Sequence, residues 1–267
     1  MSGEPEVYQQ ARRILLDALE ALGEQRSAIV LVGAQAVYLH TGDADIAVAP
    51  YTTDADVAID PAQLGASPLI EAAMRGGGFH PGANPGSWIK EDIAFDLMVP
   101  AALAGGGRRG ADLGVHGCRA ARKARGLEGA LVDKEAHEVA ALAQGDLRRF
   151  TILVAGPGAL LVAKLHKIAE RVGAPSRTED KDALDVLRLL RSVEADRLGR
   201  RVRLLLESPL AGETASEAIS HFKSLFGTPE SPGSNMAARA VAGLDDPDTI
   251  RASCAALAEE LLTALAQ

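Results

Sequence analysis

The sequence predicts an α+β protein in which an N-terminal part with both strands and helices, residues 1–155, precedes a helical C-terminal domain, residues 156–267. In the N-terminal part, short apolar or alternating runs are ended by glycine or proline, which is typical of strands and turns. In the C-terminal part, apolar residues recur at helical spacing. With 267 residues, 47% of them hydrophobic, the chain can bury a substantial core.

The first expected elements are a helix, a strand and a second helix. Apolar residues repeat at helical spacing through residues 11–22, and Gly23 follows where a helix cap is expected. Residues 28–32 form a short apolar run that predicts a buried strand. Gly33 ends this strand, and residues 34–40 are expected to form the next helix.

Two further strands are expected to carry aspartates on one side. In residues 52–60, apolar side chains alternate with carboxylates, and residues 93–98 alternate in the same way around Asp96. Between them, a helical segment is expected from Pro61 to the glycines at 76–78. The sequence thus predicts two strands that each have an acidic side and an apolar side.

The remaining chain is expected to contain one more strand, at residues 150–154, followed by a turn at Gly156 and then only helices. A link rich in glycine, serine and proline is expected at residues 227–234. Asp246 before Pro247 is a good start for the last helix. The expected helices span residues 159–172, 180–190, 202–206, 213–226 and 247–266.

Composition excludes several classes of protein. Aromatic residues make up only 3% of the chain, which argues against folds that stack bases on exposed rings. Cys118 and Cys254 lie far apart, so neither a disulfide framework nor a zinc module is predicted, and a reducing cytoplasm is the expected location. No apolar run approaches 18 residues and no leader-like segment begins the chain, so no membrane association is expected.

The net charge of −8 is unevenly distributed. Residues 101–126, here called the basic segment, hold six cationic residues and one aspartate, for a local charge of +5. Such a segment is either a solvated loop or a surface that binds the phosphates of RNA, and the sequence leaves both open. Its cationic residues are Arg108, Arg109, Arg119, Arg122, Lys123 and Arg125.

The aspartates suggest a metal site. Asp54 and Asp56 are two residues apart on one strand, so their side chains point to the same face, and Asp96 has the same setting on another strand. Clustered carboxylates are costly unless cations neutralise them, and oxygen ligands suit Mg²⁺. A solvated strand face is the alternative. We name Asp54, Asp56 and Asp96 the aspartate triad.

The order of these stretches resembles a known superfamily. Residues 30–36 with their glycine turn, 53–57 and 95–97 resemble the polymerase-beta-type nucleotidyltransferases, which use such a turn and such a triad. Residues 164–171 and 181–185 are similar to motifs of AbiEii-type toxins, the group that includes the MenT toxins. The resemblance covers most of residues 28–190. It implies a core with a mixed sheet that transfers a nucleoside monophosphate from a nucleoside triphosphate.

The resemblance also implies roles for individual residues. The aspartate triad would hold one or two Mg²⁺ ions, and Lys164 would contact nucleotide phosphates, although a surface lysine is the alternative. Either Asp182 or Asp185 would complete the site, unless both merely pair with Lys181 or Arg188. The nucleotide would be bound at Gly33, Ala34, Thr52, Thr53 and Lys164.

Three departures from the superfamily concern the nucleotide. Ala34 replaces the usual glycine or serine of the turn and removes a hydroxyl. Nineteen residues separate Ala34 from Asp54, more than in many relatives, and residues 49–51 stand where an arginine is often found. The metal site is compatible with these changes, but the choice of nucleotide is not defined.

The function expected from the resemblance is that of a toxin that modifies the 3′ end of tRNA and is restrained by a cognate antitoxin. One alternative is an inactive fold that only binds nucleotide or protein. Another is an enzyme that modifies a small molecule, as aminoglycoside nucleotidyltransferases do.

Overall fold

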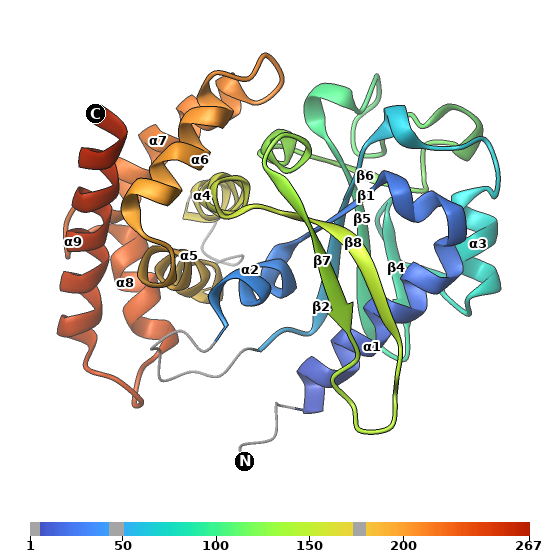
Figure 1. Ribbon diagram of the computed structural model, residues 1–267, viewed down its shortest axis with the longest axis horizontal. Coiled ribbons are helices and arrows are strands. Elements are labelled where there is room, and N and C mark those ends of the chain that lie inside the picture. The colour runs from blue at the N-terminus through green and yellow to red at the C-terminus, as the bar shows by residue number, and fades with distance from the viewer. Residues whose placement is uncertain (1–5, 43–50, 173–179) are drawn as a thin grey trace.

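The computed structural model describes residues 6–42, 51–172 and 180–267. Its strands form one mixed eight-stranded sheet in the order β3-β4-β5-β2-β1-β8-β7, and β6 pairs with β5 outside this path. Helices α5 to α9 gather at one end of the molecule, with α2 and α4 between them and the sheet (Figure 1). The expected α+β fold with a mixed sheet and a helical C-terminal part is therefore confirmed.

The elements of the N-terminal part have the following bounds. The strands are β1 (Ile29–Val32), β2 (Asp54–Ile59), β3 (His80–Pro81), β4 (Ser87–Lys90), β5 (Ile93–Pro100), β6 (Arg122–Ala124), β7 (Lys134–Ala140) and β8 (Arg149–Ala155). The α-helices are α1 (Glu6–Leu22), α2 (Gly33–Thr41) and α3 (Ile70–Gly76).

The C-terminal part is built from helices. They are α4 (Pro157–Val172), α5 (Asp180–Ser192), α6 (Ala195–Leu206), α7 (Gly212–Phe226), α8 (Pro232–Ala240) and α9 (Pro247–Ala266). As expected, the Asp246 carboxylate accepts a hydrogen bond from the Thr249 backbone N–H and caps α9. Among the described helices, none combines the length and apolar character needed to cross a bilayer.

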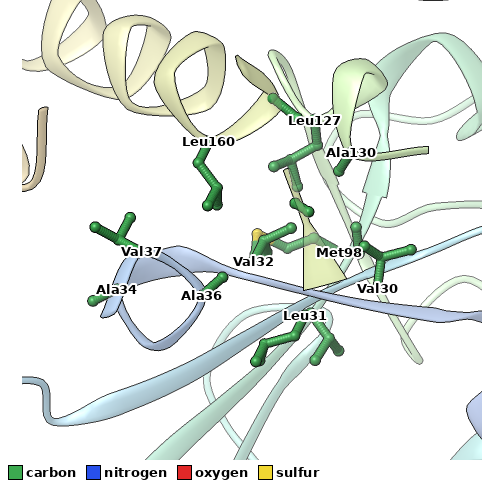
Figure 2. Close-up of a cluster of buried hydrophobic side chains, with 14 of the residues drawn as sticks. Val30, Leu31, Val32, Ala34, Ala36, Val37, Met98, Leu127, Ala130 and Leu160 are labelled. Carbon is green, nitrogen blue, oxygen red and sulfur yellow. The ribbon is translucent and has the colours of Figure 1, made fainter. Parts of the chain in front are cut away.

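The core forms on both faces of the central strands. All four residues of β1 are buried, because β2 and β8 flank the strand in the sheet and other elements pack on its faces. Figure 2 shows Val30 and Val32 pointing to one side of β1 and Leu31 to the other, with Leu160 of α4 approaching from the Val32 side. This alternation is the two-residue period of a strand. Helix α4 is thereby held over the face of the sheet that carries Val32.

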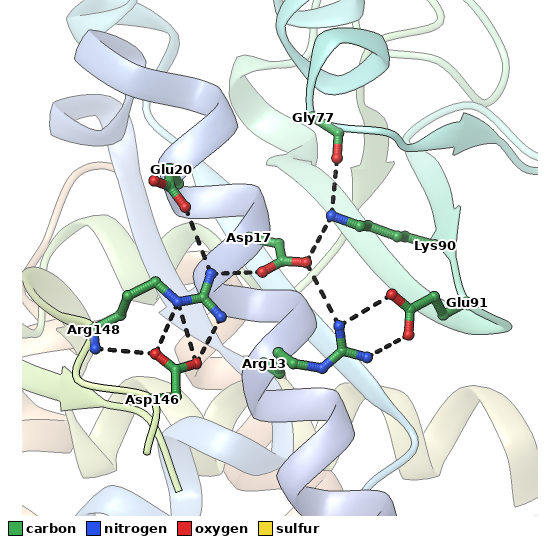
Figure 3. A network of polar contacts seen from close by, with 8 residues as sticks. All are labelled: Arg13, Asp17, Glu20, Gly77, Lys90, Glu91, Asp146 and Arg148. Carbon is green, nitrogen blue, oxygen red and sulfur yellow. Dashed lines mark hydrogen bonds and ion pairs between the residues drawn. The ribbon is translucent and has the colours of Figure 1, made fainter. Parts of the chain in front are cut away.

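Helix α1 is tied to the sheet by charges as well as by its apolar stripe. Its Asp17 carboxylate lies 2.6 Å from both Lys90 Nζ and a guanidinium nitrogen of Arg148 (Figure 3). Burial would raise the pKa of Asp17, but hydrogen bonds from these two cations outweigh it and lower the pKa. The network joins α1 to β4 and to the loop before β8.

Several sequence expectations were wrong. Strands β3, β4, β6 and β7 were not expected from the sequence, which predicted only one strand beyond residue 98. The helix expected from Pro61 to the glycines is split into a 3₁₀ turn, η2 (Pro61–Gln63), and α3, with Pro68 between them. Proline donates no backbone hydrogen bond and restricts the residue before it, which interrupts a helix. The link expected at 227–234 contains the start of α8, which begins with Pro232 in the favoured first helical position. The unusual residues at positions 49 and 50 lie outside the described residues.

Candidate functional site

The aspartate triad comes from two neighbouring strands. Strands β2 and β5 are parallel, and Asp56 is paired in register with Asp96. Adjacent strands are about 4.8 Å apart, so the two carboxylates leave the sheet side by side. Both line the same cleft, and Asp54 shares their face by the two-residue period of β2. The structure thus brings together the three aspartates that the sequence pattern suggested as metal ligands.

The glycine turn lies against this triad. Gly33 has φ +70°, and a Cβ built on it would lie 2.4 Å from Asp56 Oδ2. No other residue fits there without moving that carboxylate. Ala34 is buried in the hydrophobic core. The Gln35 side chain donates a 3.2 Å hydrogen bond to the Asp54 carbonyl and so joins the start of α2 to β2.

Asp54 is surrounded by groups that favour its ionised form. Thr52 is fully buried, and its hydroxyl donates to Asp54 Oδ1 over 2.5 Å, whereas Thr53 is exposed. Lys181 Nζ lies 3.9 Å from the same oxygen. Burial would raise the pKa of Asp54, but the charge of Lys181 and the Thr52 hydrogen bond outweigh it, and the pKa is lowered. From the sequence, Lys181 was considered only as an alternative partner of Asp182 or Asp185, so this contact was missed.

Asp56 has the opposite environment. Burial first, and then the negative charge of Asp54, raise its pKa to about 6. The Asp96 carboxylate adds to this effect, although it accepts a 3.2 Å hydrogen bond from the Arg122 guanidinium. Within the triad, Asp56 is therefore the carboxyl whose ionised form is least stabilised by its surroundings. A hard divalent cation with oxygen ligands fits this donor set.

The cleft beside the triad has a volume of about 660 Å³, within the usual range for small-molecule sites. The sheet face with Asp56 and Asp96 forms one wall, and α4 forms the other. Most of the charged side chains along it are cationic. These are Arg122, Lys123, Arg125, Lys164, Lys167 and Arg171, with Glu170 as the acid outside the triad.

Lys164 is part of a buried charge cluster. It is 4% exposed, and its Nζ lies 2.7 Å from Asp182 and 2.6 Å from Asp185. Asp182 also binds Arg171 at 2.6 Å and has Lys167 at 3.4 Å. The structure thus pairs both candidate aspartates with Lys164, whereas the alternative expected from the sequence was pairing with Lys181 or Arg188. A contact between Lys164 and nucleotide phosphate stays a prediction.

Lys167 and Arg171 were not assigned a role from the sequence. They are one and two turns beyond Lys164 on α4 and line the cleft with it. Their spacing on the helix could have indicated this, because residues three or four apart share a face. They are more exposed than Lys164, at 34% and 21% of their side-chain surface.

The basic segment divides into two groups. Arg122, Lys123 and Arg125 line the cleft, and Arg122 is on β6 beside β5. Arg125 also forms an ion pair with Glu217 at 2.6 Å. Arg108, Arg109 and Arg119 are exposed and are not among the residues that line the cleft. RNA binding by this second group stays a prediction.

Comparison with known proteins gave no match to a family model, to a curated protein or to a solved structure. The resemblance of the sequence motifs to nucleotidyltransferases is therefore an expectation about this chain.

Proposed function

We propose that the protein is a Mg²⁺-dependent nucleotidyltransferase that transfers a nucleoside monophosphate from a nucleoside triphosphate to an acceptor hydroxyl. The observation that carries the proposal is the register pairing of Asp56 with Asp96 on parallel strands, with both side chains facing a cleft lined by cations. Carboxylates beside a basic cleft suit a metal-bound triphosphate.

In this reaction the acceptor oxygen forms a bond to the α-phosphorus, and the bond from that phosphorus to the β-phosphate oxygen breaks. Pyrophosphate leaves, and the hydroxyl proton passes to water or to a cleft carboxylate. When bound, Mg²⁺ would neutralise phosphate charge and polarise the phosphorus–oxygen bonds.

The residues of the chain would bind and orient the triphosphate. Lys167, Arg171 and Arg122 supply positive charge on two walls of the cleft. Gly33 starts α2 beside the triad, so the positive end of the helix dipole faces the incoming phosphates. Thr52 holds Asp54 in place, and the lowered pKa of Asp54 keeps this carboxylate ionised at neutral pH.

As acceptor we propose the 3′ end of tRNA, with the protein acting in the cytoplasm as the toxin of a toxin–antitoxin pair. The support is the motif resemblance together with Arg122, Lys123 and Arg125 at the cleft, where they could hold an RNA backbone. A cognate antitoxin would then be a protein partner.

The test is to incubate the full chain with Mg²⁺, total tRNA and each α-labelled nucleoside triphosphate in turn. We expect label to enter tRNA with at least one nucleotide, and Asp56→Asn and Asp96→Asn to lower the rate about 100-fold or more. Asp60→Asn is the matched control, because Asp60 follows the same strand and only caps a turn through Ala62. Equal rates in the triad variants and the control would refute the assigned site.

One observation favours an inactive, nucleotide-binding module instead. Ala34 is buried and brings no hydroxyl to the turn. Calorimetric titration with nucleotide, combined with an assay for pyrophosphate, separates the two, because a binding module takes up nucleotide without releasing pyrophosphate. Labelling of kanamycin-type compounds but not of tRNA would instead support an enzyme that modifies small molecules.

A further inference from the structure

A second cluster of ligand-type side chains lies away from the aspartate triad. His40 at the end of α2, and Glu135 and His137 on β7, each offer one ligand atom, and these atoms lie within 4.8 Å of one another. Glu135 Oε1 lies 3.2 Å from His137 Nε2 and 3.8 Å from His40 Nδ1. Ligand atoms around a tetrahedral zinc ion are about 3.4 Å apart, so these two distances bracket that value. We call these three residues the histidine cluster.

The hydrogen bonds of His40 point its free lone pair into the cluster. Its Nε2 lies 2.8 Å from the Ala155 carbonyl oxygen, which can only accept, so Nε2 carries the proton. In the neutral ring Nδ1 is then an acceptor, and it faces the Oε1 atom of Glu135, which is also an acceptor and is hydrogen-bonded to His137 Nε2 over 3.2 Å. Glu135 can donate nothing to His40 Nδ1, so a cation between these two atoms would satisfy the lone pair of Nδ1.

The surroundings of the cluster match those of a metal site. Metal-binding histidines usually donate their second N–H to a carbonyl or carboxylate, as His40 does to Ala155. The other Glu135 oxygen, Oε2, accepts a 3.0 Å hydrogen bond from Arg201, which holds the carboxylate with Oε1 turned toward the two histidines. The side chain of His40 is only 5% exposed, whereas those of Glu135 and His137 are 33% and 27% exposed, so an ion could enter from solvent.

We propose that the histidine cluster binds one Zn²⁺ ion through His40 Nδ1, Glu135 Oε1 and His137 Nε2, with water as the fourth ligand. Two imidazoles and a carboxylate suit zinc, whereas the all-carboxylate triad suits Mg²⁺. The ion would link the end of α2 to the edge strand β7. Because α2 begins at Gly33, which lines the cleft beside the triad, this link would steady the helix from its far end.

The test measures zinc binding by the chelator-treated full chain, using calorimetry and the visible absorption of the Co²⁺-substituted protein. We expect one zinc ion per chain, and His137→Ala and Glu135→Gln should weaken binding about 10-fold or more. The side chains of His137 and Glu135 are partly exposed, so we expect these variants to fold normally. The His40 side chain is only 5% exposed, so the result for His40→Ala counts only if its circular dichroism spectrum is native. His80→Ala is the matched control, because His80 is an exposed strand histidine outside the cluster.

A second control separates the two metal sites. Zinc binding should persist in Asp96→Asn, which removes a ligand of the triad only. The proposal is overturned if the wild-type chain binds no zinc, if His137→Ala binds it as tightly as His80→Ala does, or if Asp96→Asn abolishes binding while His137→Ala does not. None of these results depends on nucleotide transfer, so failure here leaves the proposed function to its own test.

Discussion

Replacing Lys164 with methionine should destabilise the protein strongly. Lys164 places an ammonium between two buried carboxylates, at 2.7 Å from Asp182 and 2.6 Å from Asp185. The substitution keeps a similar side-chain volume but removes the charge. Asp182 retains Arg171 and Lys167, whereas Asp185 loses the ammonium beside it. The cost therefore falls mainly on Asp185.

The expected loss is about 3 kcal/mol in the free energy of unfolding at pH 7. Removing one partner of a buried ion pair typically costs about 3–5 kcal/mol, and the cations left around Asp182 favour the lower end. For a chain of this size, that corresponds to a fall of about 6–12 °C in the melting temperature. Lys167→Met is the matched control on the same helix; its side chain is 34% exposed, so we expect a loss below about 1 kcal/mol.

The effect should depend on pH with a defined sign. Burial opposes ionisation of Asp182, but the charge of Lys164 and its other cations outweigh this, and its pKa is lowered well below the ordinary value. A carboxyl with a lowered pKa stabilises the fold above its unfolded-state pKa of about 3.9, and this contribution is lost as the pH falls. The difference between wild type and Lys164→Met should therefore be largest near pH 7 and shrink below about pH 4.

Urea unfolding followed by circular dichroism measures these differences. Adding Asp185→Asn to Lys164→Met should recover about 1–2 kcal/mol, because it removes the carboxylate that was left unpaired. If Lys164→Met cost no more than the Lys167→Met control, or if the second substitution made it worse, the ammonium would not be compensating buried charge.

Three further predictions concern the triad. Gly33→Ala should destabilise the fold by at least about 2 kcal/mol in urea unfolding and weaken Mn²⁺ binding in calorimetry. The reasons are the left-handed backbone conformation at residue 33 and the 2.4 Å distance between the new Cβ and Asp56 Oδ2. Unchanged stability would contradict this prediction. Asp56→Asn should be about 2–3 kcal/mol more stable than the metal-free wild type at pH 7.5, because the pKa of Asp56 in the folded wild type is raised to about 6. This gain in stability should fade as the pH falls toward about 4, where Asp56 is protonated in the folded wild type. A gain that grows in acid would refute the assignment. Arg122→Met should bind Mn²⁺ several-fold more tightly without nucleotide, because it removes the cation 3.2 Å from Asp96. The same variant should raise KM for the triphosphate in rate assays. Weaker Mn²⁺ binding would argue against competition between Arg122 and the metal for Asp96.

The central part of the fold could be predicted because its sequence patterns are unambiguous. Strands β1, β2, β5 and β8 have apolar or alternating runs, and α9 begins at a capping aspartate followed by proline. Edge strands lack such patterns. In β7, only Val139 is buried and the other side chains are charged, polar or alanine, so the segment does not look like a strand. Charged side chains on an edge strand prevent pairing with another sheet and so protect against aggregation. They also remove the apolar pattern by which a strand is predicted from sequence.

The candidate site could be predicted only where its residues follow the side-chain repeat of a single strand or helix. The two-residue period places Asp54 and Asp56 on one face, but only the parallel pairing of β2 with β5 brings Asp96 beside them. The contact of Lys181 with Asp54 depends on how α5 packs, which no local pattern encodes. His40 and His137 are likewise far apart in the sequence and meet only because α2 ends beside the edge of the sheet.

The most direct test of the central claim is a crystal structure with Mn²⁺ and a non-hydrolysable nucleoside triphosphate, with the metal located by its anomalous scattering. We expect an anomalous peak about 2.1–2.3 Å from carboxylate oxygens of both β2 and β5, with the triphosphate along the wall that carries Lys167 and Arg171. A nucleotide bound outside the cleft, or manganese bound only away from Asp54, Asp56 and Asp96, would contradict it.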